Sequence, residues 1–207
     1  MKHIPNLLTG LRLVLSLAMF AALVVVASGS QSVSSDTITW LIRFSLIAFV
    51  VAAVTDFFDG WLARRWGAVS LIGAILDPIA DKILVCGAIL GLIAMHAPEM
   101  LLFGGVILFR EFAVSALREV LAPRGIKLPV TFLAKVKTTL QLVAIVAMMV
   151  MWFWPAWSID ARIDHLRIAL DGAILLMAVA TLVTLWTGLE YARSALLALG
   201  DSFEKRQ

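Results

Sequence analysis

The chain has 207 residues, of which 62% are hydrophobic and 15% are charged. This composition excludes an ordinary soluble domain, in which apolar residues make up nearer half of the chain. The formal net charge of +3 is too small and too dispersed to indicate nucleic-acid binding. Only one cysteine is present, Cys86, which excludes a disulfide within these residues.

The sequence predicts six membrane-spanning helices, with a short interfacial helix over residues 1–12 leading into the first. The first span is expected to end near Ala27 and the fifth to run from about Lys135 to near Trp154. The other spans are expected over residues 38–65, 71–95, 100–121 and 166–193. We therefore expect an all-α polytopic membrane protein that forms a single domain over residues 1–207. A signal peptide is the alternative for the basic start and first apolar run, although no clear cleavage pattern precedes residues 28–36.

Basic residues are distributed unequally between the two ends of the predicted spans. Arg162 and Arg167 fall at one end, and Arg43 lies inside a span. The basic residues at the other end are Lys2, Arg12, Arg64, Arg65, Arg124, Lys127, Lys135, Lys137, Arg193, Lys205 and Arg206. Because positive charge marks the cytoplasmic side of a membrane protein, we expect both termini to be cytoplasmic.

Four aspartates lie within residues 55–82, a stretch otherwise apolar enough for a membrane. Asp56 and Asp59 are spaced i, i+3, and Asp77 and Asp81 are spaced i, i+4, so each pair shares one helical face. With a turn at residues 66–70, both faces lie about 12 to 15 Å from that turn. The sequence therefore predicts that a helical hairpin brings the four carboxylates together, with the mouth of the cluster facing the cytoplasm.

Four carboxylates in such a place repel one another unless a cation sits among them. Oxygen ligands without His or Cys favour a hard divalent ion, so we expect Mg²⁺ or Mn²⁺. The alternative is a set of ion pairs that only hold the helices together, although acids inside a membrane are usually functional. Lys82, next to Asp81, is expected either to pair with an acid or to contact a substrate.

Three further polar groups fall on helical faces. Near the amino terminus, Asn6, Thr9 and Arg12 are spaced to face one ligand, or alternatively form a solvated interfacial face. In the fourth span, Glu111, Ser115 and Arg118 share a face, with Arg110 beside it; in the fifth, Lys137, Thr138 and Gln141 share a face. These groups suit a phosphate or polyol at the membrane surface, and the alternative is that the basic residues only reach out to the interface.

The segment around the aspartates resembles the signature of the CDP-alcohol phosphatidyltransferases. The matching residues are Asp56, Asp59, Gly60, Ala63, Arg64, Gly73, Asp77 and Asp81. The resemblance implies that a CDP-linked lipid donates to an alcohol and that CMP leaves. It implies that Asp56, Asp59 and Asp77 hold a pair of metal ions, with Asp81 as ligand and general base. The residues it places around the CDP-lipid are Asn6, Thr9, Arg12, Gly60, Ala63, Arg64, Ser70 and Gly73.

The stretches 110–119 and 134–141 and the amino-terminal segment resemble bacterial phosphatidylglycerophosphate synthases. The resemblance implies CDP-diacylglycerol as donor, sn-glycerol 3-phosphate as acceptor, a homodimer, and a site at the cytoplasmic face of the bacterial inner membrane. The residues expected around the acceptor phosphate are Arg110, Arg118, Lys135, Lys137, Thr138 and Gln141. Inositol, inositol phosphate and serine stay open as alternative acceptors.

Two other functional classes are alternatives to a transferase. A cation or proton-coupled transporter needs a polar path to both sides of the membrane, but residues 38–54 and 85–94 offer Arg43 as their one charged residue. A noncatalytic lipid-binding scaffold predicts that the CDP-lipid binds without release of CMP.

Overall fold

The computed structural model describes residues 4–29, 33–66, 71–126 and 132–204. Side chains at 4–6, 57–66, 71, 72, 74, 132, 134, 135 and 200–204 lie outside this description. The long helices are α1 (Ile4–Ala27), α2 (Ser35–Trp66), α3 (Leu71–Ala94), α4 (Pro98–Leu121), α5 (Phe132–Phe153) and α6 (Ile163–Glu204). Two short 3₁₀ segments, η1 (Ala122–Arg124) and η2 (Trp154–Trp157), follow α4 and α5.

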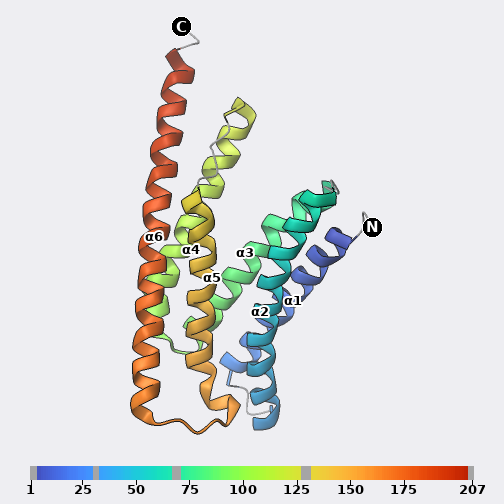
Figure 1. The fold of residues 1–207 in the computed structure, drawn as a ribbon, viewed down its shortest axis with the longest axis vertical. Helices are drawn as coiled ribbons and strands as arrows, with labels where there is room; N and C mark the ends of the chain where they lie inside the picture. Colours follow the sequence, from blue (N-terminus) through green and yellow to red (C-terminus); the bar gives the residue numbers. More distant parts are fainter. Residues whose placement is uncertain (1–3, 30–32, 67–70, 127–131, 205–207) are drawn as a thin grey trace.

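The helices form two groups that α2 and α3 connect (Figure 1). In one group α1 packs along α2 and α3, and in the other α4 and α5 both pack on α6. Helix α3 also contacts α4 and α5, and α2 also contacts α5 and η2. The carboxyl ends of α2, α4 and α6 lie toward the top of Figure 1, and those of α1, α3 and α5 lie toward the bottom.

The described helices confirm an all-α protein with several helices able to cross a membrane. Five stretches are long and apolar enough: Leu7–Ala27, Ser35–Asp56, Pro98–Arg124, Val136–Trp157 and Ile163–Leu199. Helix α3, the expected third of six spans, is not among them, because it carries Asp77, Asp81 and Lys82 along its length. The amino-terminal segment that we expected as a short interfacial helix is continuous with the first span in α1.

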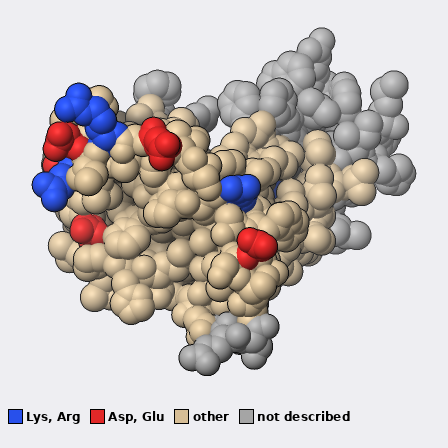
Figure 2. All heavy atoms as spheres, turned by 90° about the horizontal axis from the view of Figure 1, so that it is seen from below, with Lys and Arg blue, Asp and Glu red and all other residues tan. Residues whose placement is uncertain are grey.

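Figure 2 shows the lower end of the molecule, where most of the surface is uncharged and several charged side chains gather at the upper left. The residues that join α1 to α2, α3 to α4 and η2 to α6, which are 28–34, 95–97 and 158–162, include only Asp160 and Arg162 as charged residues in the sequence. Toward the opposite end, the sequence has Arg64 and Arg65 in the last turn of α2, and Arg124 and Lys127 between α4 and α5. Basic residues are therefore more numerous toward that end.

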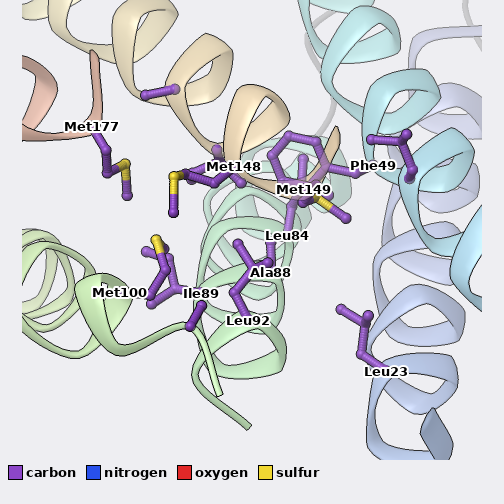
Figure 3. Close-up of a cluster of buried hydrophobic side chains, with 14 of the residues drawn as sticks. Leu23, Phe49, Leu84, Ala88, Ile89, Leu92, Met100, Met148, Met149 and Met177 are labelled. Carbon is purple, nitrogen blue, oxygen red and sulfur yellow. The ribbon is translucent and has the colours of Figure 1, made fainter. Parts of the chain in front are cut away.

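The core lies where the helices of both groups meet α3 (Figure 3). Leu23 of α1, Phe49 of α2, Ile89 of α3, Met100 of α4 and Met148 of α5 are all fully buried there. Small residues allow this close packing, as in many membrane bundles. A Cβ on Gly104 of α4 would lie 2.4 Å from Cγ2 of that same Ile89. The α3–α4 contact therefore depends on a residue without a side chain.

Gly104 and its neighbour Gly105 provide a matched test of this packing. A Cβ on Gly105 would meet nothing within 4 Å, so both alanine variants gain helix propensity but only Gly104→Ala must displace Ile89. We expect Gly104→Ala to be less stable than Gly105→Ala by about 1 to 3 kcal/mol, the usual cost of overpacking. Thermal unfolding of both variants in the same detergent measures the difference; equal midpoints would contradict the packing.

Candidate active site

Arg12 of α1 is completely buried, and carboxylates from two other helices surround its guanidinium. Its Nη1 lies 2.6 Å from Oδ1 of Asp56 on α2 and 2.6 Å from Oδ1 of Asp81 on α3. Its Nη2 lies 4.0 Å from Oδ1 of Asp77, also on α3. The structure therefore brings together three of the four aspartates that the sequence predicted to converge, and one arginine joins them.

Helical spacing explains how α1 reaches these carboxylates. Thr9 and Arg12 are three residues apart and share a face of α1, while Asp77 and Asp81 are four apart and share a face of α3. The hydroxyl of Thr9 donates a hydrogen bond of 2.7 Å to Oδ1 of Asp77, the same oxygen that faces Arg12. We call Thr9, Arg12, Asp56, Asp77 and Asp81 the carboxylate cluster.

The charges of the carboxylate cluster are arranged by depth. The Arg12 side chain has no exposed surface, whereas the side chains of Asp56, Asp77 and Asp81 keep 39%, 48% and 51% of theirs. The guanidinium therefore forms the floor of the cluster and the carboxylates form an accessible rim. Three carboxylates against one guanidinium leave an excess of negative charge at that rim.

The donor set suits a hard divalent cation, because it consists of carboxylate oxygens from adjacent helices. Within the described residues, no group of three His, Cys, Asp or Glu side chains already has the arrangement of a metal site. The carboxylates converge on Arg12 instead. The cluster is nevertheless suited to a cation, because its carboxylates are accessible and carry an excess of negative charge.

Gly73 is the one residue predicted around the CDP-lipid, apart from Thr9 and Arg12, whose burial is described. It is buried on α3, one turn before Asp77. The other predicted residues lie where side chains are not described, and these are Asn6, Asp59, Gly60, Ala63, Arg64 and Ser70.

A second polar group lies where α4, α5 and α6 meet, with Glu111 of α4 at its centre. The ammonium of Lys137, on α5, donates to Oε1 of Glu111. Nη1 of Arg110 lies 3.5 Å from the same oxygen. Both cations are almost fully buried, at 7% exposure for Arg110 and 5% for Lys137. Charges this deep in an apolar bundle are costly unless partners surround them.

Helix α6 adds Thr187 and Tyr191 to this group, two residues for which the sequence predicted no role. Nη2 of Arg110 donates to Oγ1 of Thr187 at 3.1 Å, and Nη2 of Arg118 donates to the hydroxyl of Tyr191 at 2.9 Å. Thr187 and Tyr191 are polar residues spaced i, i+4 within an apolar helix, which was the available signal. We call Arg110, Glu111, Arg118, Lys137, Thr187 and Tyr191 the basic cluster.

The other residues predicted around an acceptor have different surroundings. Gln141 is 3% exposed and lies one turn after Lys137 on α5, whereas the side chain of Thr138 is exposed. Ser115, expected on the same face as Glu111, is partly exposed. The side chain of Lys135 is outside the described set.

Lys82 contacts the helix that carries the basic cluster. It follows Asp81 on α3, and its ammonium lies 6.0 Å from the centre of the Phe112 ring on α4, within the range of a cation–π contact. Phe112 directly follows Glu111 of the basic cluster in the sequence. Residues next to Asp81 and to Glu111 therefore meet where α3 contacts α4.

Comparisons with known proteins give a matching family and several relatives that cover most of the chain. The family model described as CDP-alcohol phosphatidyltransferase matches residues 2–189. A protein of Escherichia coli (strain K12), named "CDP-diacylglycerol--glycerol-3-phosphate 3-phosphatidyltransferase", is 38% identical over 167 residues, which cover 79% of this chain and 85% of the relative. Proteins with the same name from Shigella flexneri serotype 5b (strain 8401) and Shigella boydii serotype 4 (strain Sb227) match with the same identity and coverage.

Arg12 is the residue on which the carboxylate cluster depends. Arg12→Gln leaves three carboxylates facing one another, and we expect the protein to lose about 3 kcal/mol, the lower end for a broken buried ion pair because the carboxylates are half exposed. Arg12→Lys keeps the charge but not the two-nitrogen fork, so its loss should be smaller. Thermal unfolding in metal-free detergent buffer compares the three proteins. Equal midpoints would show that the cluster does not depend on Arg12.

Proposed function

Since the chain belongs to the CDP-alcohol phosphatidyltransferase family, we propose that it transfers a phosphatidyl group from CDP-diacylglycerol to sn-glycerol 3-phosphate. The products would be phosphatidylglycerophosphate and CMP, which makes this an enzyme of phospholipid biosynthesis. The observation that carries the proposal is the convergence of Asp56, Asp77 and Asp81 on one buried arginine, together with a separate group of cations around Glu111.

The carboxylate cluster would take the donor. Asp56, Asp59, Asp77 and Asp81 would hold two divalent ions, Mg²⁺ or Mn²⁺, and such ions supply charge neutralisation at a pyrophosphate. Arg12 and Thr9 would keep the carboxylates in place from below, because both contact them directly. The remaining residues proposed around the CDP-lipid are Asn6, Gly60, Ala63, Arg64, Ser70 and Gly73.

Asp81 would act as the general base. Half of its side-chain surface is exposed, and it directly precedes Lys82, whose side chain approaches Phe112 of α4. Asp81 would accept the proton of the acceptor hydroxyl as that oxygen bonds to the phosphorus that carries diacylglycerol. The bond from this phosphorus to the bridging oxygen then breaks, and CMP leaves with that oxygen.

The basic cluster would hold the acceptor. Arg110, Arg118 and Lys137 contribute three cations, whereas Glu111 is the one carboxylate in contact with them among the described side chains. The excess of positive charge favours an acceptor that already carries a phosphate. Inositol has no anionic group, so this argument supports glycerol 3-phosphate over it. Lys135, Thr138 and Gln141 are proposed to complete the site.

The proposal also includes the arrangement in the membrane. Helix α3 would also span the membrane, which brings the number of spans to six, because α1, α2, α4 and α5 all contact it and its acids pair with Arg12 of α1. The first turns of α1 would lie at the interface. The end rich in Arg and Lys would face the cytoplasm of a bacterial cell, so that both termini and both clusters lie at the inner face of the cytoplasmic membrane. The family resemblance adds a homodimer.

Removal of the proposed base gives the first test. In detergent with CDP-diacylglycerol and radiolabelled glycerol 3-phosphate, we expect Asp81→Asn to lower kcat by at least about 100-fold, the usual contribution of a general base. Asp171→Asn, which changes an exposed aspartate on α6, should retain full activity. Activity in Asp81→Asn equal to wild type would remove Asp81 from this role.

The acceptor and the reaction class are tested by CMP release with a panel of alcohols. We expect release with glycerol 3-phosphate and little with inositol, inositol phosphate or serine. Binding of CDP-diacylglycerol without release of CMP with any alcohol would favour a scaffold, and ion flux across vesicles without CMP release would favour a transporter.

Metal removal gives a further test. Because the carboxylate cluster has an excess of negative charge, we expect EDTA to abolish CMP release and Mg²⁺ or Mn²⁺ to restore it. Ca²⁺ has the same charge but prefers longer bonds and more ligands, so it is the matched control and should restore less activity. Full activity in EDTA would contradict the metal-dependent mechanism.

A further inference from the structure

The ring of Tyr191 lies beside two guanidinium groups of α4. The central carbon of Arg118 is 5.1 Å from the centre of the ring, and that of Arg110 is 5.9 Å from it. Both distances fall within the range of a cation–π contact. Tyr191 is 5% exposed and its hydroxyl also accepts the hydrogen bond from Arg118, so one buried side chain on α6 contacts both arginines.

Neighbouring features of α6 orient Arg110. The hydroxyl of Thr187 accepts from Arg110 and is itself within 3.0 Å of the carbonyls of Val183 and Thr184, so its proton has a partner in its own helix. At Gly188, an added Cβ would lie only 2.8 Å from Cγ of Arg110. The side chain of Arg110 therefore runs closely along α6, between Thr187 and Tyr191.

Two guanidinium groups on one helix repel each other and would separate unless other groups hold them. The described contacts of Arg118 are with Tyr191, and those of Arg110 are with Glu111, Thr187 and Tyr191. Glu111 is also bound to Lys137, so it does not neutralise both arginines. The electron-rich ring of Tyr191 is therefore the group that the two arginines share, and its hydroxyl also binds Arg118.

We propose that Tyr191 is a positioning residue for the acceptor phosphate, which holds Arg110 and Arg118 as a preformed pair before that phosphate binds. This inference rests on the proposed function, because it takes the basic cluster as the acceptor site. The cost of ordering two long side chains is then incurred during folding rather than during binding. Loss of Tyr191 should consequently weaken acceptor binding and leave the donor site unchanged.

The test compares steady-state kinetics of full-length wild type, Tyr191→Leu and Tyr191→Phe, with CDP-diacylglycerol and glycerol 3-phosphate in the same detergent. Tyr191→Leu removes both the ring and the hydroxyl, and we expect KM for glycerol 3-phosphate to rise about tenfold. Tyr191→Phe keeps the ring, so its KM should rise only about threefold. In both variants kcat and KM for CDP-diacylglycerol should stay within about twofold of wild type, because the carboxylate cluster is untouched.

Trp186→Leu is the matched control, because it removes an aromatic side chain of the same helix that is 62% exposed. It should leave all three constants unchanged. Arg118→Gln provides a second check: combined with Tyr191→Leu, it should raise KM by less than the product of the two single effects, because both act partly through one guanidinium.

Several results would overturn the inference. An unchanged KM for glycerol 3-phosphate in both Tyr191 variants of an active enzyme would overturn it and leave the proposed function in place. A parallel loss of kcat and of affinity for both substrates would show a purely structural role. If Tyr191→Leu does not fold, the KM of Tyr191→Phe decides the question. Absence of CMP release by wild type would overturn the proposed function and this inference with it.

Discussion

The contact of a buried guanidinium with three carboxylates is the constraint on which the rest of the site depends. Arg12 has no exposed surface, and such a charge is tolerated in an apolar bundle only when partners surround it. Asp56 and Asp81 share one of its nitrogens, and Asp77 faces the other. The same contacts attach α1 to α2 and α3. Packing of the first three helices and assembly of the acidic rim are therefore one event.

Helix α3 has two roles that conflict in sequence but agree in space. Its charges exclude it from the stretches that are apolar enough to span a membrane by composition. Helices α2 and α3 each contact members of both groups. The side chains of Asp77 and Asp81 on α3 are 48% and 51% exposed and meet Arg12 and Thr9 of α1. The helix least suited to lipid by composition is thus one whose acids are paired with polar groups of a neighbouring helix.

The two clusters have opposite excess charge. The acidic rim is partly exposed, whereas Arg110 and Lys137 are almost fully buried. This arrangement suits two anionic substrates that must approach each other. One would bind through ions held by carboxylates, and the other would bind arginine and lysine directly. Through Thr187 and Tyr191, α6 contributes to the basic cluster.

Local periodicity in the sequence determined the helices, most of their ends to within a few residues, and the shared faces of Asp77 with Asp81 and of Thr9 with Arg12, because these depend on residues three or four apart. The end of α6 was wrong, because this helix was expected to end near Arg193 and runs to Glu204. The tertiary structure decided which faces meet. The contacts of Arg12 with Asp81, Arg118 with Tyr191 and Arg110 with Thr187 join residues 69, 73 and 77 positions apart. No spacing rule reaches that far, because such pairs depend on how whole helices pack. For that reason Arg12 was expected beside a ligand rather than beneath the carboxylates, and Tyr191 had no predicted role.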